Sequence, residues 1–213
     1  MKYFAPLILF VVAVFLIGFV SSTNTNSIAT CRMYDNFNSG ELDLNKWFER
    51  TWHDRPFTDE HYVDSTEGRY HVAQHNRWDA ETNLGFTREF NPGDLLFYEV
   101  YYNSGDGNHM TQPLVNGNYP PESEEECPNR NAGCGTIGYW NGEPHLGTQI
   151  GKYKVKFEFL DDKIRARFTR PDGTSEIYNW IGFSDPYVIE FNTHTGHNGI
   201  LHMDYDNIIV CTN

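Results

Sequence analysis

The stretch KYKVKFEFLDDKIRARFTRPDGTSEIYNWI, residues 152–181, determines the fold class. From Tyr153 to Phe159, apolar residues occupy every second position and charged residues occupy the positions between them. A period of two indicates a β-strand with one buried face and one solvated face. Asp161-Asp162 and Pro171-Asp172-Gly173 are turn sequences, and extended runs resume after each of them. The stretch therefore predicts three consecutive antiparallel strands.

Short extended runs separated by Gly, Pro, Asn and Asp continue on both sides of this stretch. No run after the N-terminal segment has the periodicity of a helix. A series of about ten short strands without an internal repeat predicts an all-β fold, an antiparallel two-sheet β-sandwich or jelly roll. Further strands are expected at residues 47–53, 60–64, 69–74, 84–90, 95–102, 187–191 and 201–211, with a polar loop at 193–199.

The N-terminus predicts export. Lys2 precedes an apolar run from Phe4 to Val20, and Ser21 and Ser22 follow it. An apolar run of about 17 residues suits either a signal peptide cleaved after Ser22 or a retained membrane anchor. In both cases the rest of the chain is expected to be secreted or held at the extracytoplasmic surface, with membrane contact only through an uncleaved N-terminal segment.

The remaining length accommodates a single domain. We expect residues 1–22 to be the signal peptide or anchor, 23–30 a short linker and 31–211 the domain. Within the domain, residues 103–134 are rich in Gly, Asn, Pro and acidic residues and lack a strand pattern, which predicts a long loop.

The charge of the chain limits its partners. A formal net charge of −13 and a pI near 5.0 argue against a nucleic-acid partner, because phosphate binding needs clustered Lys and Arg. The aromatic content of 15% is high, and in an exported protein such residues divide between core packing and platforms for flat ligands.

Four cysteines, Cys31, Cys127, Cys134 and Cys211, predict two disulfides in an oxidising compartment. Three pairings are possible. If the first and last strands of the sandwich are neighbours, Cys31 pairs with Cys211, and Cys127 then closes a short loop with Cys134. A zinc site is the alternative, but the chain has no CxxC spacing.

Two passages near the ends of the domain resemble the concanavalin A-like lectin and glucanase jelly rolls, which are also described as laminin-G-like. They are YDNFNSGELDLNKW at residues 34–47 and GILHMDYDNIIV at residues 199–210. The resemblance implies a concanavalin-like sandwich over nearly the whole domain. It leaves three functions open: a carbohydrate-binding, lectin-like domain, which we expect; a glycoside hydrolase or polysaccharide lyase; and an adhesive or structural surface protein.

The residues of these two passages have structural interpretations. Asp35 and Asp43 are suited to capping turns, Gly40 to a positive φ, and Trp47 to the core. Leu201, Met203 and Tyr205 share one phase of the last strand and Ile208 and Val210 share the other, which predicts a bulge near Asp206-Asn207.

The resemblance also implies a structural Ca²⁺ held by Asp35 and Asp206. The alternative is that Asp206 accepts hydrogen bonds from backbone amides. No other cofactor is required.

The absence of two known catalytic signatures argues against an enzyme without excluding one. The E-x-D-x-x-E strand of laminarinase-type hydrolases does not occur, and Gln149-Ile150 is followed by Gly151 where a lyase motif has histidine. His194, His197 and His202 could gather as metal ligands or a general base, but a loop of polar residues is the stronger explanation.

A sugar site needs an aromatic platform flanked by planar polar groups. Arg88 and Glu99 share the phase of apolar neighbours on their strands, so each is expected either in a binding groove near Tyr98 and Tyr102 or in a structural ion pair. Trp52 is expected in the core. The candidate platforms are Trp78, Tyr98, Tyr102, Trp140 and Trp180.

Overall fold

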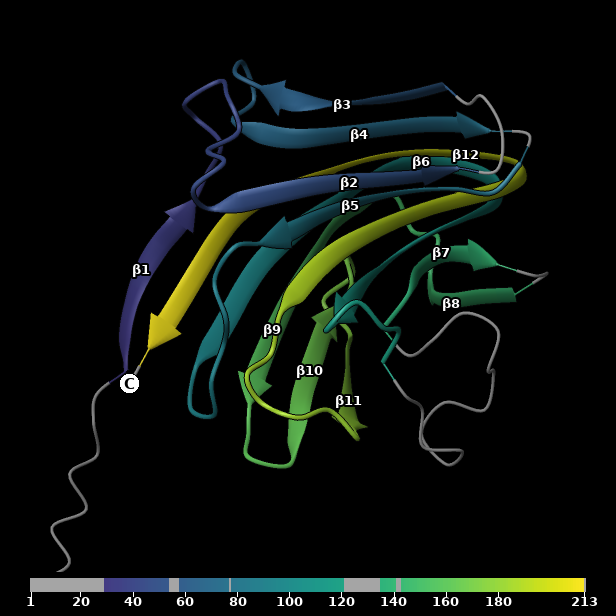
Figure 1. The fold of residues 1–213 in the computed structure, drawn as a ribbon. Helices are drawn as coiled ribbons and strands as arrows, with labels where there is room; N and C mark the ends of the chain where they lie inside the picture. Colours follow the sequence, from purple (N-terminus) through teal and green to yellow (C-terminus); the bar gives the residue numbers. More distant parts are fainter. Residues whose placement is uncertain (1–28, 54–57, 77, 121–134, 141–142, 213) are drawn as a thin grey trace, which may run out of the picture.

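The computed structural model describes residues 29–53, 58–76, 78–120, 135–140 and 143–212 (Figure 1). This part of the chain contains twelve strands and no helix, so none that could cross a membrane. The strands are β1 (Thr30–Asp35), β2 (Trp47–His53), β3 (Thr58–Asp64), β4 (Arg69–Asn76), β5 (Ala80–Phe86), β6 (Leu95–Val115), β7 (Ile137–Trp140), β8 (Glu143–Gly147), β9 (Gly151–Phe159), β10 (Lys163–Thr169), β11 (Ser175–Ile181) and β12 (Ile189–Thr212).

Two long strands, β6 and β12, run through both layers of the sandwich (Figure 1). In the first layer the strand order is β11-β10-β9-β6-β12-β4-β3, and β1 pairs with the end of β12. In the second layer the first half of β12 lies between β5 and the second half of β6, with β2, β7 and β8 outside them. All pairs are antiparallel, as the alternation of the sequence predicts.

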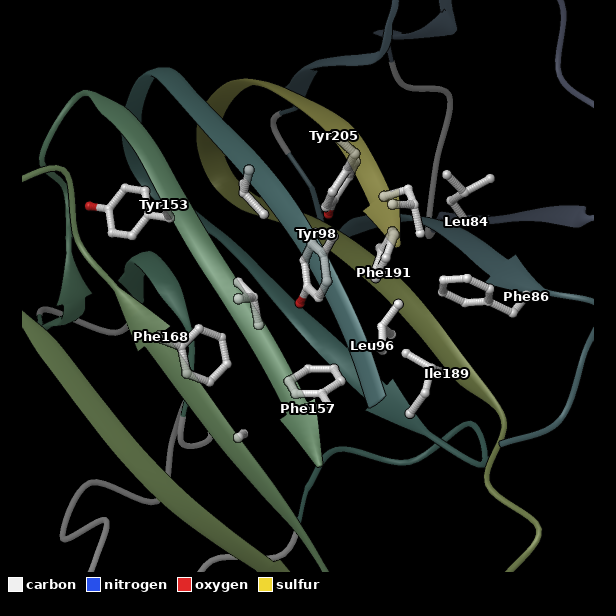
Figure 2. Close-up of a cluster of buried hydrophobic side chains, with 14 of the residues drawn as sticks. Leu84, Phe86, Leu96, Tyr98, Tyr153, Phe157, Phe168, Ile189, Phe191 and Tyr205 are labelled. Carbon is white, nitrogen blue, oxygen red and sulfur yellow. The ribbon is translucent and has the colours of Figure 1, made fainter. Parts of the chain in front are cut away.

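The core lies between the layers and is mainly aromatic (Figure 2). Tyr98 of the first layer contacts Phe191 of the second, with ring centroids 4.4 Å apart. Phe191 also stacks on Tyr205 at 4.8 Å, and Phe157 packs edge to face on Trp180 at 5.2 Å. Burial of such large side chains is the main stabilising contribution to a sandwich.

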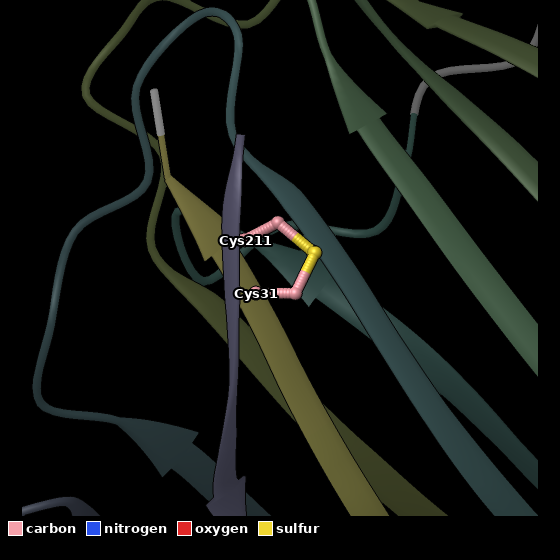
Figure 3. The surroundings of a disulfide bond; sticks show 2 residues. All are labelled: Cys31 and Cys211. Atoms are coloured by element: carbon pink, nitrogen blue, oxygen red, sulfur yellow. A yellow bond between two sulfur atoms is a disulfide. The ribbon is translucent and has the colours of Figure 1, made fainter. Parts of the chain in front are cut away.

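The two ends of the domain meet as predicted. Cys31 and Cys211 are directly opposite each other on β1 and β12 and form a disulfide (Figure 3). Cys127 and Cys134 lie outside the described residues.

The turn that follows β1 has the structure that its sequence predicts. The carboxylate of Asp35 accepts hydrogen bonds from the Phe37 amide at 2.9 Å and from the indole of buried Trp47 at 2.8 Å. Asp43 accepts one from the Asn45 amide at 3.0 Å, and Gly40 has a φ of 77°. The predicted bulge is also confirmed, because the register shifts between Asp206 and Ile209 and Asn207 has a φ of 52°.

The largest differences from the sequence prediction concern three segments. The expected loop at 193–199 lies within β12, residues 103–115 of the expected long loop belong to β6, and the strand expected at 84–90 is β5, Ala80–Phe86. The Gly-, Asn- and His-rich runs are extended because they pair with partner strands, as between Thr193 and both Thr82 and Thr111. Local composition does not reveal such pairing.

Removing the disulfide is expected to lower stability without changing the fold. It joins positions separated by 180 residues, so its loss frees the unfolded chain and costs about 2–5 kcal/mol. A Cys31→Ala, Cys211→Ala double variant should therefore melt at a lower temperature by circular dichroism, with an unchanged folded spectrum. A melting temperature equal to that of the oxidised wild type would contradict this contribution.

Candidate functional site

A groove lies on the face of the second layer that points away from the core. It has a volume of about 400 Å³ and is lined by Arg50, Thr51, Trp52, Glu81, Asn83, Leu114, Gly117 and Tyr119. Strand alternation produces this face. Ile189 and Phe191 of β12 are buried in the core, so the residues between and after them, Glu190, Asn192 and His194, point toward the groove side.

The register of the second layer places polar residues side by side. Asn83 on β5 is directly opposite Arg50 on β2 and Asn192 on β12, and Asn192 is also opposite Gln112 on β6. One row of polar side chains therefore crosses four strands.

Two aromatic side chains border the groove and are open to solvent. Trp52 is 50% exposed and Tyr119 is 43% exposed. The Tyr119 hydroxyl donates a 2.9 Å hydrogen bond to Oε1 of Glu81, which fixes the position of the ring. The groove thus offers apolar faces beside its polar row.

An ion pair lies at the base of the groove. Glu190 is 4% exposed, and Nη2 of Arg50 lies 3.0 Å from its Oε1 and 2.8 Å from its Oε2. Burial raises the pKa of Glu190, the neighbouring Arg50 opposes that shift, and Glu81 adds to it. Arg50 therefore stabilises a carboxylate that has little access to water.

Several buried polar atoms beside this ion pair have no hydrogen-bond partner among the described residues. The amide of Asn192 donates to Oδ1 of Asn83 at 2.7 Å and to Oε2 of Glu81 at 3.3 Å, but its own Oδ1 accepts nothing. Both ring nitrogens of His194 are also without a partner. Such groups carry a desolvation cost.

His194 lies on the groove side of β12 but is buried and is not among the residues that line the groove. Burial lowers the pKa of its imidazole, although Glu81 lies 3.6 Å away and favours the charged form. A neutral imidazole provides one donor and one acceptor. The ring packs against Trp140, with centroids 4.3 Å apart. Gly196 allows Trp140 and Asp79 to approach β12, since a β-carbon there would collide with the Asp79 carboxylate.

The predicted aromatic platforms are mostly not in the groove. Tyr98, Tyr102 and Trp180 are buried in the core, which corrects their prediction as exposed platforms. Both phases of residues 95–102 carry large apolar or aromatic side chains, with Glu99 the exception in one of them, so the sequence could not show which phase faces the outer side of the first layer. Trp140 packs against His194 on the groove side of β12, and Trp78 is exposed in the turn between β4 and β5.

Arg88 and Glu99 form structural ion pairs, the alternative left open by the sequence. Arg88 lies 3.1 Å from Asp94, and its guanidinium is 4.7 Å from the ring centroid of Phe90. Glu99 pairs with Lys152 at 3.0 Å on the outer side of the first layer. The prediction that Arg88 and Glu99 line a common binding groove is therefore wrong.

The residues do not fit the predicted calcium site. Asp35 is opposite buried Ile208 and uses its carboxylate on Phe37 and Trp47, whereas Asp206 is opposite Glu99 on the other face of the sheet. The described part of the chain also contains no group of three or more His, Cys, Asp or Glu residues that could hold a metal.

The sequence did not reveal most of the groove. Trp52, expected in the core, borders it, and Arg50, Glu81, Asn83 and Tyr119 were not predicted to be site residues. The available signal was the alternation of Glu190, Asn192 and His194 with apolar residues, but a loop was expected to begin at residue 193.

No family model and no curated protein matches the chain. Solved structures do match it. A glycoside hydrolase family protein from Mycobacterium thermorestibile is 13% identical, with a TM-score of 0.50 over 85% of this chain and 99% of that chain. A seed lectin from Lotus tetragonolobus is 6% identical, with a TM-score of 0.52 over 87% and 97%. At these identities the likeness establishes the fold, a concanavalin A-like jelly roll.

Removing Arg50 should make stability depend on the protonation of Glu190. Because burial raises the pKa of Glu190, the folded state favours the protonated carboxyl, and stability falls as pH rises above the usual value of 4.5. Without Arg50 this loss is larger. Arg50→Ala should cost about 1–2 kcal/mol at neutral pH, and the loss should shrink toward about pH 4.

Thermal unfolding across this pH range measures the effect. Adding Glu190→Gln to Arg50→Ala should restore stability at neutral pH, because no buried charge then remains. A loss that does not change with pH would contradict this account of the pair.

Proposed function

We propose that the groove binds a carbohydrate chain and that the protein is a lectin-like domain acting outside the cell. The observation that carries this proposal is a single groove in which the polar side chains of Arg50, Glu81 and Asn83 lie beside the exposed rings of Trp52 and Tyr119. Sugar hydroxyls donate and accept hydrogen bonds, and the C–H faces of a pyranose pack on aromatic rings.

The size and charge of the groove support a sugar ligand. Its volume of about 400 Å³ falls within the range of about 300–1,000 Å³ typical of ligand sites. Glu81 and Glu190 add negative charge, which favours hydroxyl donors over an anionic ligand, since Arg50 is already paired with Glu190. We therefore expect a neutral glycan.

Action outside the cell is supported by two features. The Cys31–Cys211 disulfide is of the kind that persists in oxidising compartments, and the N-terminal apolar run has the composition of an export segment. Separation of the culture medium from the membrane fraction, followed by immunodetection, tests whether the protein is released or remains anchored.

Glycan cleavage is the second candidate function. Two carboxylates, Glu81 and Glu190, lie on the groove side of neighbouring strands, and burial raises the pKa of Glu190, as suits a general acid. Three of their four oxygens accept hydrogen bonds, however, and the fourth, Oε2 of Glu190, lies 2.8 Å from Arg50. Arg50 contacts both oxygens of Glu190, and Tyr119 and Asn192 each bond one oxygen of Glu81. Binding without cleavage is therefore favoured.

A glycan array followed by calorimetry on the strongest ligand tests binding. Tyr119→Ala and Trp52→Ala should each weaken affinity by about tenfold or more, because they remove aromatic contact. Tyr62→Ala is the matched control, since Tyr62 is 48% exposed on a first-layer strand, away from the groove, and should leave affinity unchanged.

Incubation of the bound glycan with the protein and assay of released reducing ends separates the two functions. Binding without release supports the lectin-like function. Release that Glu190→Gln abolishes would establish cleavage instead, and absence of binding across the array would overturn both.

A further inference from the structure

The acidic chain carries a concentrated basic surface far from the groove. Its cations come from the outer face of β9 and β10, which lie toward one edge of the first layer (Figure 1). Six of the sixteen Lys and Arg residues of the chain lie on this basic face: Lys152, Lys154, Lys156, Lys163, Arg165 and Arg167.

The hairpin register brings the two rows of cations together. Along each strand the cations alternate with core residues, so all of one row point outward. Arg167 is directly opposite Lys156, and Lys154 is the next outward residue along β9. Adjacent strands are about 4.8 Å apart and alternate residues on a strand about 6.8 Å apart, so the charges form a closely spaced array.

This charge is only partly neutralised within the protein. Glu158 pairs with Lys156 at 2.6 Å and with Arg165 at 3.2 Å, and Glu99 pairs with Lys152. Lys154, Lys163 and Arg167 have no ion-pair partner among the described residues, and Lys154 and Arg167 are exposed. An excess of cations thus remains on a protein whose net charge is −13.

The surroundings of the basic face favour a linear anionic chain over an anionic membrane. The turns at the two ends of the strands carry Asp161, Asp162 and Asp172, all exposed. A bilayer covering the whole face would approach these carboxylates. A single chain crossing the strands between the turns meets the cations and avoids the acids.

The aromatic residues of this face argue against nucleic acid. Single-stranded nucleic acids stack their bases on open aromatic rings. Phe97 and Tyr101 are half-buried on β6, with Lys156 Nζ 5.5 Å from the Phe97 ring centroid and the Arg69 guanidinium 3.8 Å from that of Tyr101. The cations cover these rings, so the face presents charge without a stacking platform.

We propose that the basic face of β9 and β10 is a second binding surface, which holds an acidic polysaccharide by charge. This surface is independent of the groove, because it lies on the other layer and suits an anionic ligand, whereas the groove suits a neutral one. A protein with both surfaces could join a neutral glycan to an acidic one.

Affinity for polygalacturonate, measured by calorimetry at several salt concentrations, tests this proposal. Lys154→Gln, Arg167→Gln should weaken binding about tenfold at low salt and reduce the salt dependence, since two exposed charges are lost. Arg32→Gln, Lys46→Gln is the matched control. It changes net charge equally but lies on β1 and in the loop after it, and should bind as the wild type does.

Fully methyl-esterified polygalacturonate provides the uncharged ligand of the same backbone and should not bind this face. Thermal melts establish that both double variants fold. Absence of binding to polygalacturonate at low salt, or equal weakening in both double variants, would overturn the proposal. Tighter binding to phosphatidylglycerol vesicles or to a single-stranded oligonucleotide would overturn the glycan assignment in favour of that partner.

Discussion

The pairing between β6 and β12 is the constraint on which the rest of the structure depends. These two strands are antiparallel neighbours through both layers, from Cys211 opposite Leu95 to Ile189 opposite Val115, with register shifts where they pass from one layer to the other. Each layer is completed by shorter strands that pair with one of the two. The core, the disulfide and the groove all take their positions from this continuous pair.

The two outward faces of the sandwich have different chemistry. Along each strand, residues that face the shared core alternate with residues that face outward, and the outward residues differ between the two layers. Apolar side chains fill most of the interior, so most charged residues of the strands point to one of the two outer faces. On the second layer these residues are carboxylates, amides and a neutral imidazole beside open aromatic rings. On β9 and β10 they are lysines and arginines. A single acidic chain therefore presents two surfaces that suit ligands of different charge.

Some polar groups on the groove side of the second layer reduce the stability of the fold. Asn192 and His194 are buried without all their hydrogen-bond partners among the described residues, and Glu190 needs Arg50 to offset its burial. For stability alone, apolar residues at these positions would serve better. Asn192 and Glu190 instead hold the groove residues Asn83, Glu81 and Arg50 in place through hydrogen bonds and an ion pair.

The sequence by itself determined the all-β class and the bulge near Asn207, because alternation and turn residues are local signals. It favoured the pairing of Cys31 with Cys211, but only the neighbouring positions of β1 and β12 decided that pairing. The tertiary structure alone decided which residues form the groove. Glu81, Asn83 and Arg50 come close to Asn192 only through the register of three strands. Trp52 is exposed and Tyr98 is buried, the reverse of what was expected, because the sequence pattern does not say which face of a layer is buried. Long-range pairing also converted Gly-, Asn- and His-rich segments from expected loops into strands.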